Sequence, residues 1–497
     1  MSSPPDQLVI FGASGDLTAR KLIPALVRNH REGALPCALQ IIGVSRSERT
    51  SEAWRDQLRE RLPEELHDAW AEVAPHVHWV QANAAHKAEL ASLKERLDAL
   101  ARDAGAEPAR CGRLFYLALR PELFGPVVES LAHQGMLECP PQAVDGWRRV
   151  VIEKPFGTDL TTARDLNQQL LTFLREEQIF RIDHYLGKET VQNLLALRFQ
   201  NAIFEPLWNR KHVESVEISV CETVAMEGRR GAYYDTAGAL RDMVQNHVMQ
   251  VLALVAMEPP GALDADDVRN EKVKVIRSLR RFSPEEVSQN TVRAQYAVGP
   301  ARDAAYREEH GVAEASTTET FVAIRASIDN WRWSGVPFML RTGKAMTKRF
   351  TEVVLNFRTP PLDLLNGPTP AGVCALRPNR LRLLIQPDEG VRWSFLVKEP
   401  GQGMVMRHAE LGFDYDDLGS GETPEAYQRL LVDALAGNAT LFIRGDEVEA
   451  AWTFVDAIRA GWEATDAPVA DYPAGSTGPE VADALFHGCE GTWSYGP

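Results

Sequence analysis

The chain has 497 residues, 44% of them hydrophobic, which is more than one hydrophobic core usually serves, so we expect two domains. Its formal net charge of −15, without a basic run to offset it, argues against nucleic acid or an anionic membrane as a partner. No apolar run is long enough to predict a membrane-spanning helix, and the first residues lack the charged and apolar regions of a signal peptide.

The cysteines also restrict the class of protein. Six of them, at positions 37, 111, 139, 221, 374 and 489, show no C-x-x-C spacing and no pairing with histidine. This pattern favours neither a zinc site nor a disulfide framework. We therefore predict no bound metal and a reducing, cytoplasmic environment.

The first predicted element is a strand over Leu8–Phe11, which runs into a glycine turn and then into an apolar-periodic helix. This order is typical of the first unit of a dinucleotide-binding fold. Gly12 permits the tight turn, Gly15 lets a pyrophosphate approach the backbone, and the helix N-terminus favours the anion. Thr18 replaces the third glycine of the usual fingerprint, so the motif alone is also compatible with an ordinary strand-to-helix turn.

The end of the second predicted strand, Leu39–Val44, indicates which nicotinamide cofactor is favoured. An NAD site usually has Asp or Glu there, which accepts a hydrogen bond from the ribose and repels a 2′-phosphate. This chain has Arg46 between two serines, and a guanidinium flanked by hydroxyls suits the 2′-phosphate of NADP. Glu48 weakens that preference, and a plain surface arginine is the alternative.

Further strands are predicted at Val77–Val80, Leu114–Ala118, Arg149–Ile152 and residues 179–183, with helices between them. We expect the strand at residues 179–183 to be the last of an open parallel sheet. Ligands bind such a sheet at the carboxyl ends of its strands, which places Lys154 in the crevice. A lysine that merely precedes a proline in a loop is the plainer interpretation.

Nine residues, Arg181–Glu189, crowd an acid, an imidazole, a phenol and an ammonium between two hydrophobic runs. Phosphate recognition requires cationic and hydroxyl donors that converge on its oxygens. Since His184 and Lys188 are four residues apart, a helix that begins here would carry both on one face, and Tyr185 adds a third donor. The block therefore predicts a site for a phosphorylated substrate, with a solvated helix start as the alternative.

The second half of the chain changes to strands of period two, at Val213–Val220, Thr320–Ser327 and Arg382–Ile385. Alternation predicts a mainly antiparallel sheet covered on one side, whose open face is a natural dimer surface. The predicted architecture is α/β plus α+β. A Rossmann-like dinucleotide-binding domain occupies residues 1–185, and a larger domain built on the antiparallel sheet occupies residues 186–497.

A predicted helix over Leu240–Val255 carries the best candidate for a catalytic base. His247 lies along its apolar stripe, three residues after Val244, and a histidine satisfied within the core is the cautious interpretation. For the isolated sequence that cautious interpretation is preferred, and the nearby polar residues Asp242 and Asn246 count toward a functional role. Hydride transfer from an alcohol requires removal of the hydroxyl proton, and an imidazole that titrates near neutrality does this well.

Together these segments resemble the glucose-6-phosphate dehydrogenase family. The resemblance covers nearly the whole chain in the expected order, and the nine-residue block is its most specific motif. The matching segments are Gly12–Leu17, Glu153–Gly157, Arg181–Glu189, Arg241–His247, Arg341–Met346, Leu384–Gly390, Glu425–Leu431 and Leu441–Glu447.

The resemblance implies oxidation of D-glucose 6-phosphate to 6-phospho-D-glucono-1,5-lactone, with hydride transfer from C1 to NADP, as the first step of the oxidative pentose phosphate pathway. It implies that His247 is the base and that Asp183 orients and stabilises it. Substrate binding is implied for Lys154, His184, Tyr185, Lys188, Glu222, Asp242, Lys344 and Arg349. Lys348 is the alternative to Arg349. Cofactor binding is implied for Gly12, Ser14, Gly15, Asp16, Leu17, Arg46 and again Lys154.

The family also implies a homodimer or homotetramer that needs no metal. Two other interpretations stay open at this stage. One is a related hexose or sugar-phosphate dehydrogenase with a different substrate preference, and the other is a catalytically silent paralogue, against which the intact set of candidate residues speaks.

Overall fold

The computed structural model describes residues 5–35, 39–138, 146–226, 230–362, 364, 378–417, 424–487 and 492–496. Cys111 and Cys221 are buried free thiols, and the other four cysteines lie outside the described residues. Within the described part of the chain, no helix combines the length and the apolar character needed to cross a membrane.

The chain forms two compact units. The first contains residues 1–187, 262–269 and 424–449, and the second contains residues 188–261, 270–423 and 450–497. The first unit thus includes residues 262–269 and 424–449, which lie outside the range 1–185 that was predicted for the first domain.

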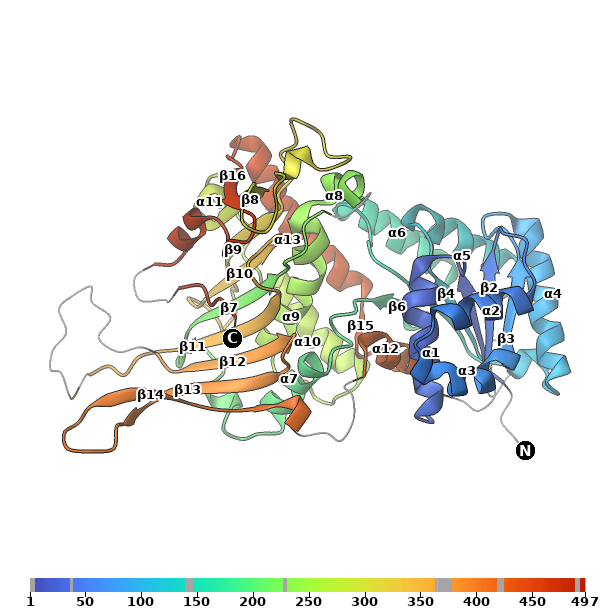
Figure 1. The fold of residues 1–497 in the computed structure, drawn as a ribbon, viewed down its shortest axis with the longest axis horizontal. Helices are drawn as coiled ribbons and strands as arrows, with labels where there is room; N and C mark the ends of the chain where they lie inside the picture. Colours follow the sequence, from blue (N-terminus) through green and yellow to red (C-terminus); the bar gives the residue numbers. More distant parts are fainter. Residues whose placement is uncertain are drawn as a thin grey trace. The chain divides into compact units, whose positions relative to one another are not determined.

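Seven strands form the sheet of the first unit, in the order β15-β6-β5-β4-β1-β2-β3 (Figure 1). All neighbours are parallel except β15, which is antiparallel to β6. The predicted strands are confirmed, but β15 extends the sheet past β6, so β6 is not the edge. The strands are β1 (Gln7–Phe11), β2 (Gln40–Ser45), β3 (Val77–Gln81), β4 (Arg113–Leu117), β5 (Arg148–Ile152), β6 (Ile179–Ile182) and β15 (Phe442–Ile443).

Helices flank this sheet in two packed groups (Figure 1). Every residue of β1 and β4 is buried, so the side chains on both faces of these strands are covered, as in other parallel sheets. α1 contacts α3 and α12, whereas α5 contacts α4 and α6. The helices are η1 (Thr18–Leu22), α1 (Ile23–Arg31), α2 (Ser51–Arg61), α3 (His67–Val73), α4 (Lys87–Asp103), α5 (Phe124–His133), α6 (Leu160–Phe173) and α12 (Ala426–Ala436). This arrangement is the predicted Rossmann-like domain.

Nine strands form the sheet of the second unit, in the order β14-β13-β12-β11-β7-β10-β9-β8-β16. The sheet is mainly antiparallel, as predicted, since only the pairs β7/β10 and β8/β16 are parallel. The strands are β7 (Val213–Cys221), β8 (Thr291–Ala297), β9 (Phe321–Ser327), β10 (Pro337–Gly343), β11 (Phe350–Phe357), β12 (Arg380–Gln386), β13 (Gly390–Lys398), β14 (Met406–Asp414) and β16 (Ala470–Pro473).

The helices of the second unit include the predicted helix after residue 240, which begins as the π-helix η8 and continues as α9. Helices α10 and α13 each contain residues assigned to both units. The bounds are α7 (Glu189–Phe199), α8 (Arg230–Ala239), η8 (Leu240–Val248), α9 (Met249–Ala256), α10 (Ala265–Arg277), α11 (Pro284–Asn290), α13 (Gly445–Ala464) and η11 (Glu480–Leu485).

The central strands of this sheet are buried on both faces, so the predicted one-sided cover is wrong for them. Every residue of β10 and β11 is buried. On one face of β10, Phe338 packs against Trp333, whose indole donates to the carbonyl of Ala256 at the end of α9 (2.8 Å). On the other face, Arg341 contacts the C-terminal segment.

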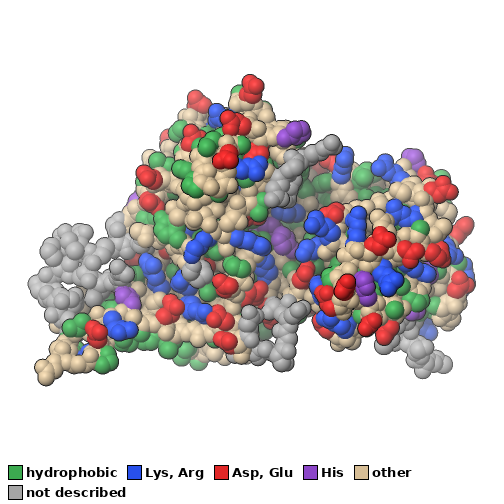
Figure 2. All heavy atoms as spheres, viewed as in Figure 1, with side chains coloured by type: hydrophobic (Ala, Val, Ile, Leu, Met, Phe, Trp, Pro, Cys, Tyr) green, Lys and Arg blue, Asp and Glu red, His purple; other side chains and the backbone are tan. Residues whose placement is uncertain are grey.

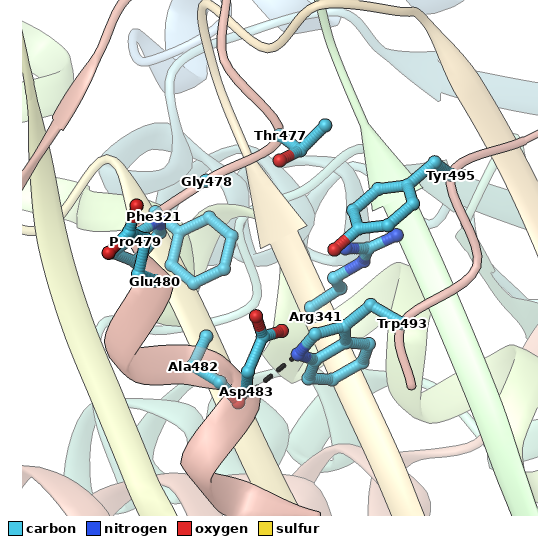
Figure 3. A pocket seen from close by; sticks show the side chains of 10 residues that line it. All are labelled: Phe321, Arg341, Thr477, Gly478, Pro479, Glu480, Ala482, Asp483, Trp493 and Tyr495. Atoms are coloured by element: carbon cyan, nitrogen blue, oxygen red, sulfur yellow. Dashed lines mark hydrogen bonds between the residues drawn. The ribbon is translucent and has the colours of Figure 1, made fainter. Parts of the chain in front are cut away.

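Arg341 holds residues 492–496 against β10 and forms one wall of the pocket in Figure 3. Its guanidinium donates to Ser219 Oγ (3.0 Å) and to the carbonyl of Ser494, and it lies over the rings of Trp493 and Tyr495 at 4.7 and 5.3 Å. Cation–π contacts and hydrogen bonds together anchor the C-terminal segment as cover for the sheet.

The sheet is less buried toward its edge strand β14, where large apolar side chains are exposed. Leu411 is 66% exposed and Met406 36%, and Met404 and Val405 before the strand are also exposed. Hydrophobic side chains run along this edge at the lower left of Figure 2. An exposed apolar edge strand is typical of a surface that pairs with another chain.

Candidate functional site

The glycine turn lies at the carboxyl end of β1 and is closed by backbone hydrogen bonds. Gly12 has a φ of +79°, and a Cβ there would lie 2.2 Å from the carbonyl oxygen of Ala118, so only glycine fits. The amide of Gly15 donates to Gly12 O (2.8 Å). Thr18, in the place of the third glycine, is fully buried at the start of η1. The backbone thus has the sharp turn that a dinucleotide site requires.

The remaining turn residues point to the neighbouring strand end and to solvent. Ser14 Oγ lies 3.0 Å from Ser45 Oγ, which joins the ends of β1 and β2. Asp16 is exposed and pairs with Arg20 (3.1 Å), while Leu17 is half-buried before η1. Arg46 follows β2 with an exposed side chain. Arg46 and the glycine turn therefore lie at the same edge of the sheet.

Glu153 and Lys154 follow β5 at that same edge. Glu153 Oε1 accepts hydrogen bonds from the hydroxyls of Tyr116 (2.5 Å) and Tyr427 (3.2 Å), and Tyr427 belongs to α12. Burial is the largest effect on Glu153 and raises the pKa of its carboxyl. Two phenols thus fix the residue next to Lys154, whose side chain is half-buried.

Asp183 follows β6 and forms a turn instead of starting a helix. Its side chain is 2% exposed and accepts from the amide of Tyr185 (2.9 Å), and its carbonyl accepts from the amide of Leu186 (3.1 Å). Helix α7 begins only at Glu189. The prediction that His184 and Lys188 share a helix face is therefore wrong, because the Asp183 turn uses the residues between them.

Within the nine-residue block, the side chains differ in exposure. Tyr185 is buried with its ring 5.1 Å from that of His184, which is half-buried. Lys188 is the N-cap residue of α7, and its ammonium donates to Gln386 Oε1 at the end of β12. Thr190 donates to Glu389 in the following turn (2.6 Å). The start of α7 is thus fixed to the β12–β13 turn.

Glu222 and Lys344 meet in the second unit because β7 and β10 are parallel neighbours that end together. The amide of Glu222 donates to Gly343 O (2.9 Å), and Lys344 Nζ lies 2.6 Å from Glu222 Oε2. Lys344 Nζ also lies 5.1 Å from the ring centroid of Tyr234. Arg349, five residues farther on, is exposed, as is Lys348.

Asp242 and His247 lie on η8. More of this helix is buried than the single apolar stripe that was predicted. Most of its residues are buried, including His247 at 1% exposure, while Asp242 is half-buried. Asn246 Oδ1 lies at hydrogen-bond distance from the amide of His247. His247 belongs to the second unit and Asp183 to the first.

Two residues of the second unit lie among the candidates although the sequence did not predict them. Tyr234 lies beneath Lys344. Burial raises the pKa of its phenol, and the nearby carboxylates of Asp242, Glu319 and Glu222 raise it further. Glu319 accepts from the amide of Leu240 (2.9 Å) at the start of η8. The only sequence signal for Glu319 was an acidic residue directly before the predicted strand Thr320–Ser327.

Comparison with known families matches nearly the whole chain. Residues 9–193 match the family model described as "Glucose-6-phosphate dehydrogenase, NAD binding domain". Residues 195–494 match the one described as "Glucose-6-phosphate dehydrogenase, C-terminal domain".

Curated relatives match this chain over nearly the whole length of both proteins. The glucose-6-phosphate 1-dehydrogenase of Aggregatibacter actinomycetemcomitans is 44% identical over 485 residues, which are 96% of this chain and 95% of the relative. The enzyme of the same name from Rhizobium meliloti (strain 1021) is 43% identical over 502 residues, with 99% and 98% covered.

Solved structures agree with these relatives. One is described as glucose-6-phosphate dehydrogenase in complex with its substrate glucose-6-phosphate; it has a TM-score of 0.90 and 32% identity, and 99% of each chain is covered. The glucose-6-phosphate 1-dehydrogenase from Mycobacterium avium has a TM-score of 0.82 and 36% identity, again with 99% of each chain covered.

Proposed function

Because the chain belongs to the glucose-6-phosphate dehydrogenase family, we propose that it oxidises D-glucose 6-phosphate to 6-phospho-D-glucono-1,5-lactone with NADP, as the first step of the oxidative pentose phosphate pathway. The observation that carries the proposal is the full-length match, at a TM-score of 0.90, to a dehydrogenase solved with that substrate. The complete set of candidate residues supports an active enzyme and not a silent paralogue.

In the proposed reaction, His247 removes the proton of the C1 hydroxyl while the hydrogen on C1 leaves as hydride. NADP, when bound, accepts that hydride. Asp183 orients the imidazole and stabilises the imidazolium that forms. The burial of His247 supports this role, since a buried imidazole held in one place transfers a proton from a defined position.

The phosphate of the substrate is assigned to His184, Tyr185 and Lys188. A dianion is recognised best by an ammonium together with neutral or cationic donors. The hydrogen bond from Lys188 to Gln386 supports the assignment, because it holds the ammonium at a defined place. Lys154 and Arg349 add positive charge to the proposed substrate site.

The hydroxyl groups of the sugar are assigned to Glu222 and Asp242, with Lys344 beside them. Carboxylates accept hydrogen bonds from hydroxyls, and an ammonium donates to them. The ion pair between Glu222 and Lys344 supports this part of the proposal, because it presents an acceptor and a donor side by side.

The cofactor is assigned to the glycine turn and to Arg46, with Lys154 at its nicotinamide end. The dinucleotide-binding domain supports a nicotinamide cofactor. The exposed Arg46 after β2 supports NADP over NAD, because its guanidinium is suited to a 2′-phosphate. The turn residues are Gly12, Ser14, Gly15, Asp16 and Leu17.

We further propose that the chain forms a homodimer or homotetramer and acts in the cytoplasm. The exposed apolar side chains of β14 support association through this edge of the sheet. The buried free thiols of Cys111 and Cys221 fit a reducing compartment.

Steady-state kinetics of the purified protein tests the function. We expect turnover of glucose 6-phosphate with NADP, weaker use of NAD, and little oxidation of glucose without its phosphate. Equal kcat/KM for glucose and glucose 6-phosphate would favour a free-hexose dehydrogenase, and the absence of turnover with any of these pairs would favour a silent paralogue.

A further inference from the structure

Glu319 connects the start of η8 to the strand β9 through two consecutive amides. Its carboxylate accepts from the amide of Leu240 (2.9 Å), and its backbone carbonyl accepts from the amide of Ala239 (2.9 Å). The first amides of a helix have no partner within the helix, and a negative charge there also complements the helix dipole. Glu319 is only 8% exposed, so it performs this role inside the protein.

The next residue, Thr320, holds the segment that carries Lys344. The carbonyl of Thr320 accepts from the amide of Lys344 (3.0 Å). The hydroxyl of Tyr472 lies 3.0 Å from Thr320 Oγ1 and donates to the carbonyl of Lys344 (2.6 Å). Two neighbouring residues, 319 and 320, thus fix the backbones of both η8 and Lys344.

Gly238 makes room for this contact. It has a φ of +73° and interrupts the helical path near the end of α8, two residues before η8 begins. A Cβ at this position would lie 2.4 Å from Glu319 Oε1. Glycine therefore provides both the backbone conformation and the space that let the carboxylate reach the start of η8.

We propose that Glu319 is a positioning residue for the reaction, which sets the place of Asp242 and His247 on η8 relative to Lys344. The inference rests on the proposed function of those three residues. A displacement of a catalytic group by about 1 Å can reduce the rate by about 10²-fold, so a fixed helix start has a direct effect on turnover. Glu319 acts through η8 and does not itself need to contact the substrate.

The test compares Glu319→Ala with Glu319→Gln. The amide oxygen of glutamine still accepts from Leu240, whereas alanine leaves that amide without its partner. We expect Glu319→Ala to lower kcat at least about tenfold with little change in the KM for NADP, and Glu319→Gln to restore kcat to within a few-fold of wild type. Gly238→Ala should resemble Glu319→Ala.

Glu217→Ala is the matched control, since Glu217 is a buried carboxylate of the same unit that accepts from a backbone amide, that of Ser494 (2.9 Å). We expect this control to lower the melting temperature but to keep kcat. The proposal is overturned if Glu319→Gln is as impaired as Glu319→Ala. It is equally overturned if Glu319→Ala and Glu217→Ala have similar melting temperatures and Glu319→Ala loses no more kcat than Glu217→Ala does.

Hydrogen exchange separates this inference from the proposed function, because it requires no substrate. The amides of residues 239–247 should exchange faster in Glu319→Ala than in wild type and be protected again in Glu319→Gln. Unchanged exchange in Glu319→Ala would overturn the positioning role. An inactive wild-type protein with the expected exchange pattern would instead count against the proposed reaction alone.

Discussion

The ammonium of Lys344 lies 2.6 Å from the carboxylate of Glu222, so side chains 122 residues apart in the sequence form one ion pair. The two strands that precede these residues, β7 and β10, are parallel neighbours, and the pair lies where both strands end. Through this ion pair, each residue holds the other in place.

We expect Glu222→Gln and Lys344→Met to be strongly non-additive in kcat/KM for glucose 6-phosphate. Once one partner is removed, the other has lost its orientation, so the second substitution costs less. The coupling should be about 1 kcal/mol or more, a factor of about five, in a double-mutant cycle. Losses that add within about 0.5 kcal/mol would show that the two residues act independently.

His247→Asn should lower kcat at least about 10²-fold while the KM for glucose 6-phosphate changes little. Asparagine retains polar atoms of similar size but does not accept a proton near neutral pH. Circular dichroism and the melting temperature verify that the buried helix η8 is intact. A kcat within a few-fold of wild type would remove His247 from the role of base.

Arg46→Ala should raise the KM for NADP and have far less effect on the KM for NAD. Only NADP carries the 2′-phosphate that the guanidinium is proposed to bind. Arg59→Ala, an exposed arginine on α2, is the matched control for the loss of one positive charge. Equal effects of Arg46→Ala on both cofactors would place Arg46 away from the adenosine end.

The stability of the protein should fall on mild acidification because of His78 on β3. Burial, followed by the charges of Arg55, Arg96 and His76, lowers the pKa of His78 from 6.5 to about 4. Between these values the unfolded chain binds a proton that the folded chain does not, so the free energy of unfolding decreases as the pH falls below about 6.5.

His78→Gln removes this titration and should flatten the decrease between pH 6.5 and 4.5. Because the imidazole is partly exposed, we expect an effect on the order of 1 kcal/mol after allowance for solvent screening. Melting temperatures of both proteins over this range provide the measurement. Parallel curves for the wild type and the variant would show that His78 does not account for the acid sensitivity.

Elements with a strong local signal could be predicted from the sequence. The strand before Gly12 is apolar from Leu8 onward and ends in a turn that requires glycine. The strand before Glu153 ends in an apolar run that is followed by a proline. Buried parallel strands have this pattern because both of their faces are covered. The carboxyl-end placement of Lys154 then followed from the topology.

Other features depend on contacts between distant residues, which no local pattern reveals. Helix α12 lies in the first unit, where Glu425 at its N-cap pairs with Lys21 (3.1 Å), 404 residues away in the sequence, and with Arg28 (3.2 Å). Glu319 is likewise 79 residues from Leu240. The error over His184 and Lys188 has a local cause, since spacing alone does not distinguish a helix start from the turn that Asp183 stabilises.

The protein is proposed to oxidise a phosphorylated hexose whose phosphate binds at Lys188. This is tested most directly by measuring kcat/KM of Lys188→Ala and of wild type on glucose 6-phosphate and on glucose. A charge-assisted contact with the phosphate contributes roughly 1.5–3 kcal/mol, so kcat/KM for glucose 6-phosphate should fall about tenfold to over a hundredfold, while slow oxidation of glucose barely changes. Lys274→Ala, an exposed lysine on α10, should leave both unchanged. Parallel losses on both substrates in Lys188→Ala, with a lower melting temperature, would contradict the account and place the phosphate elsewhere.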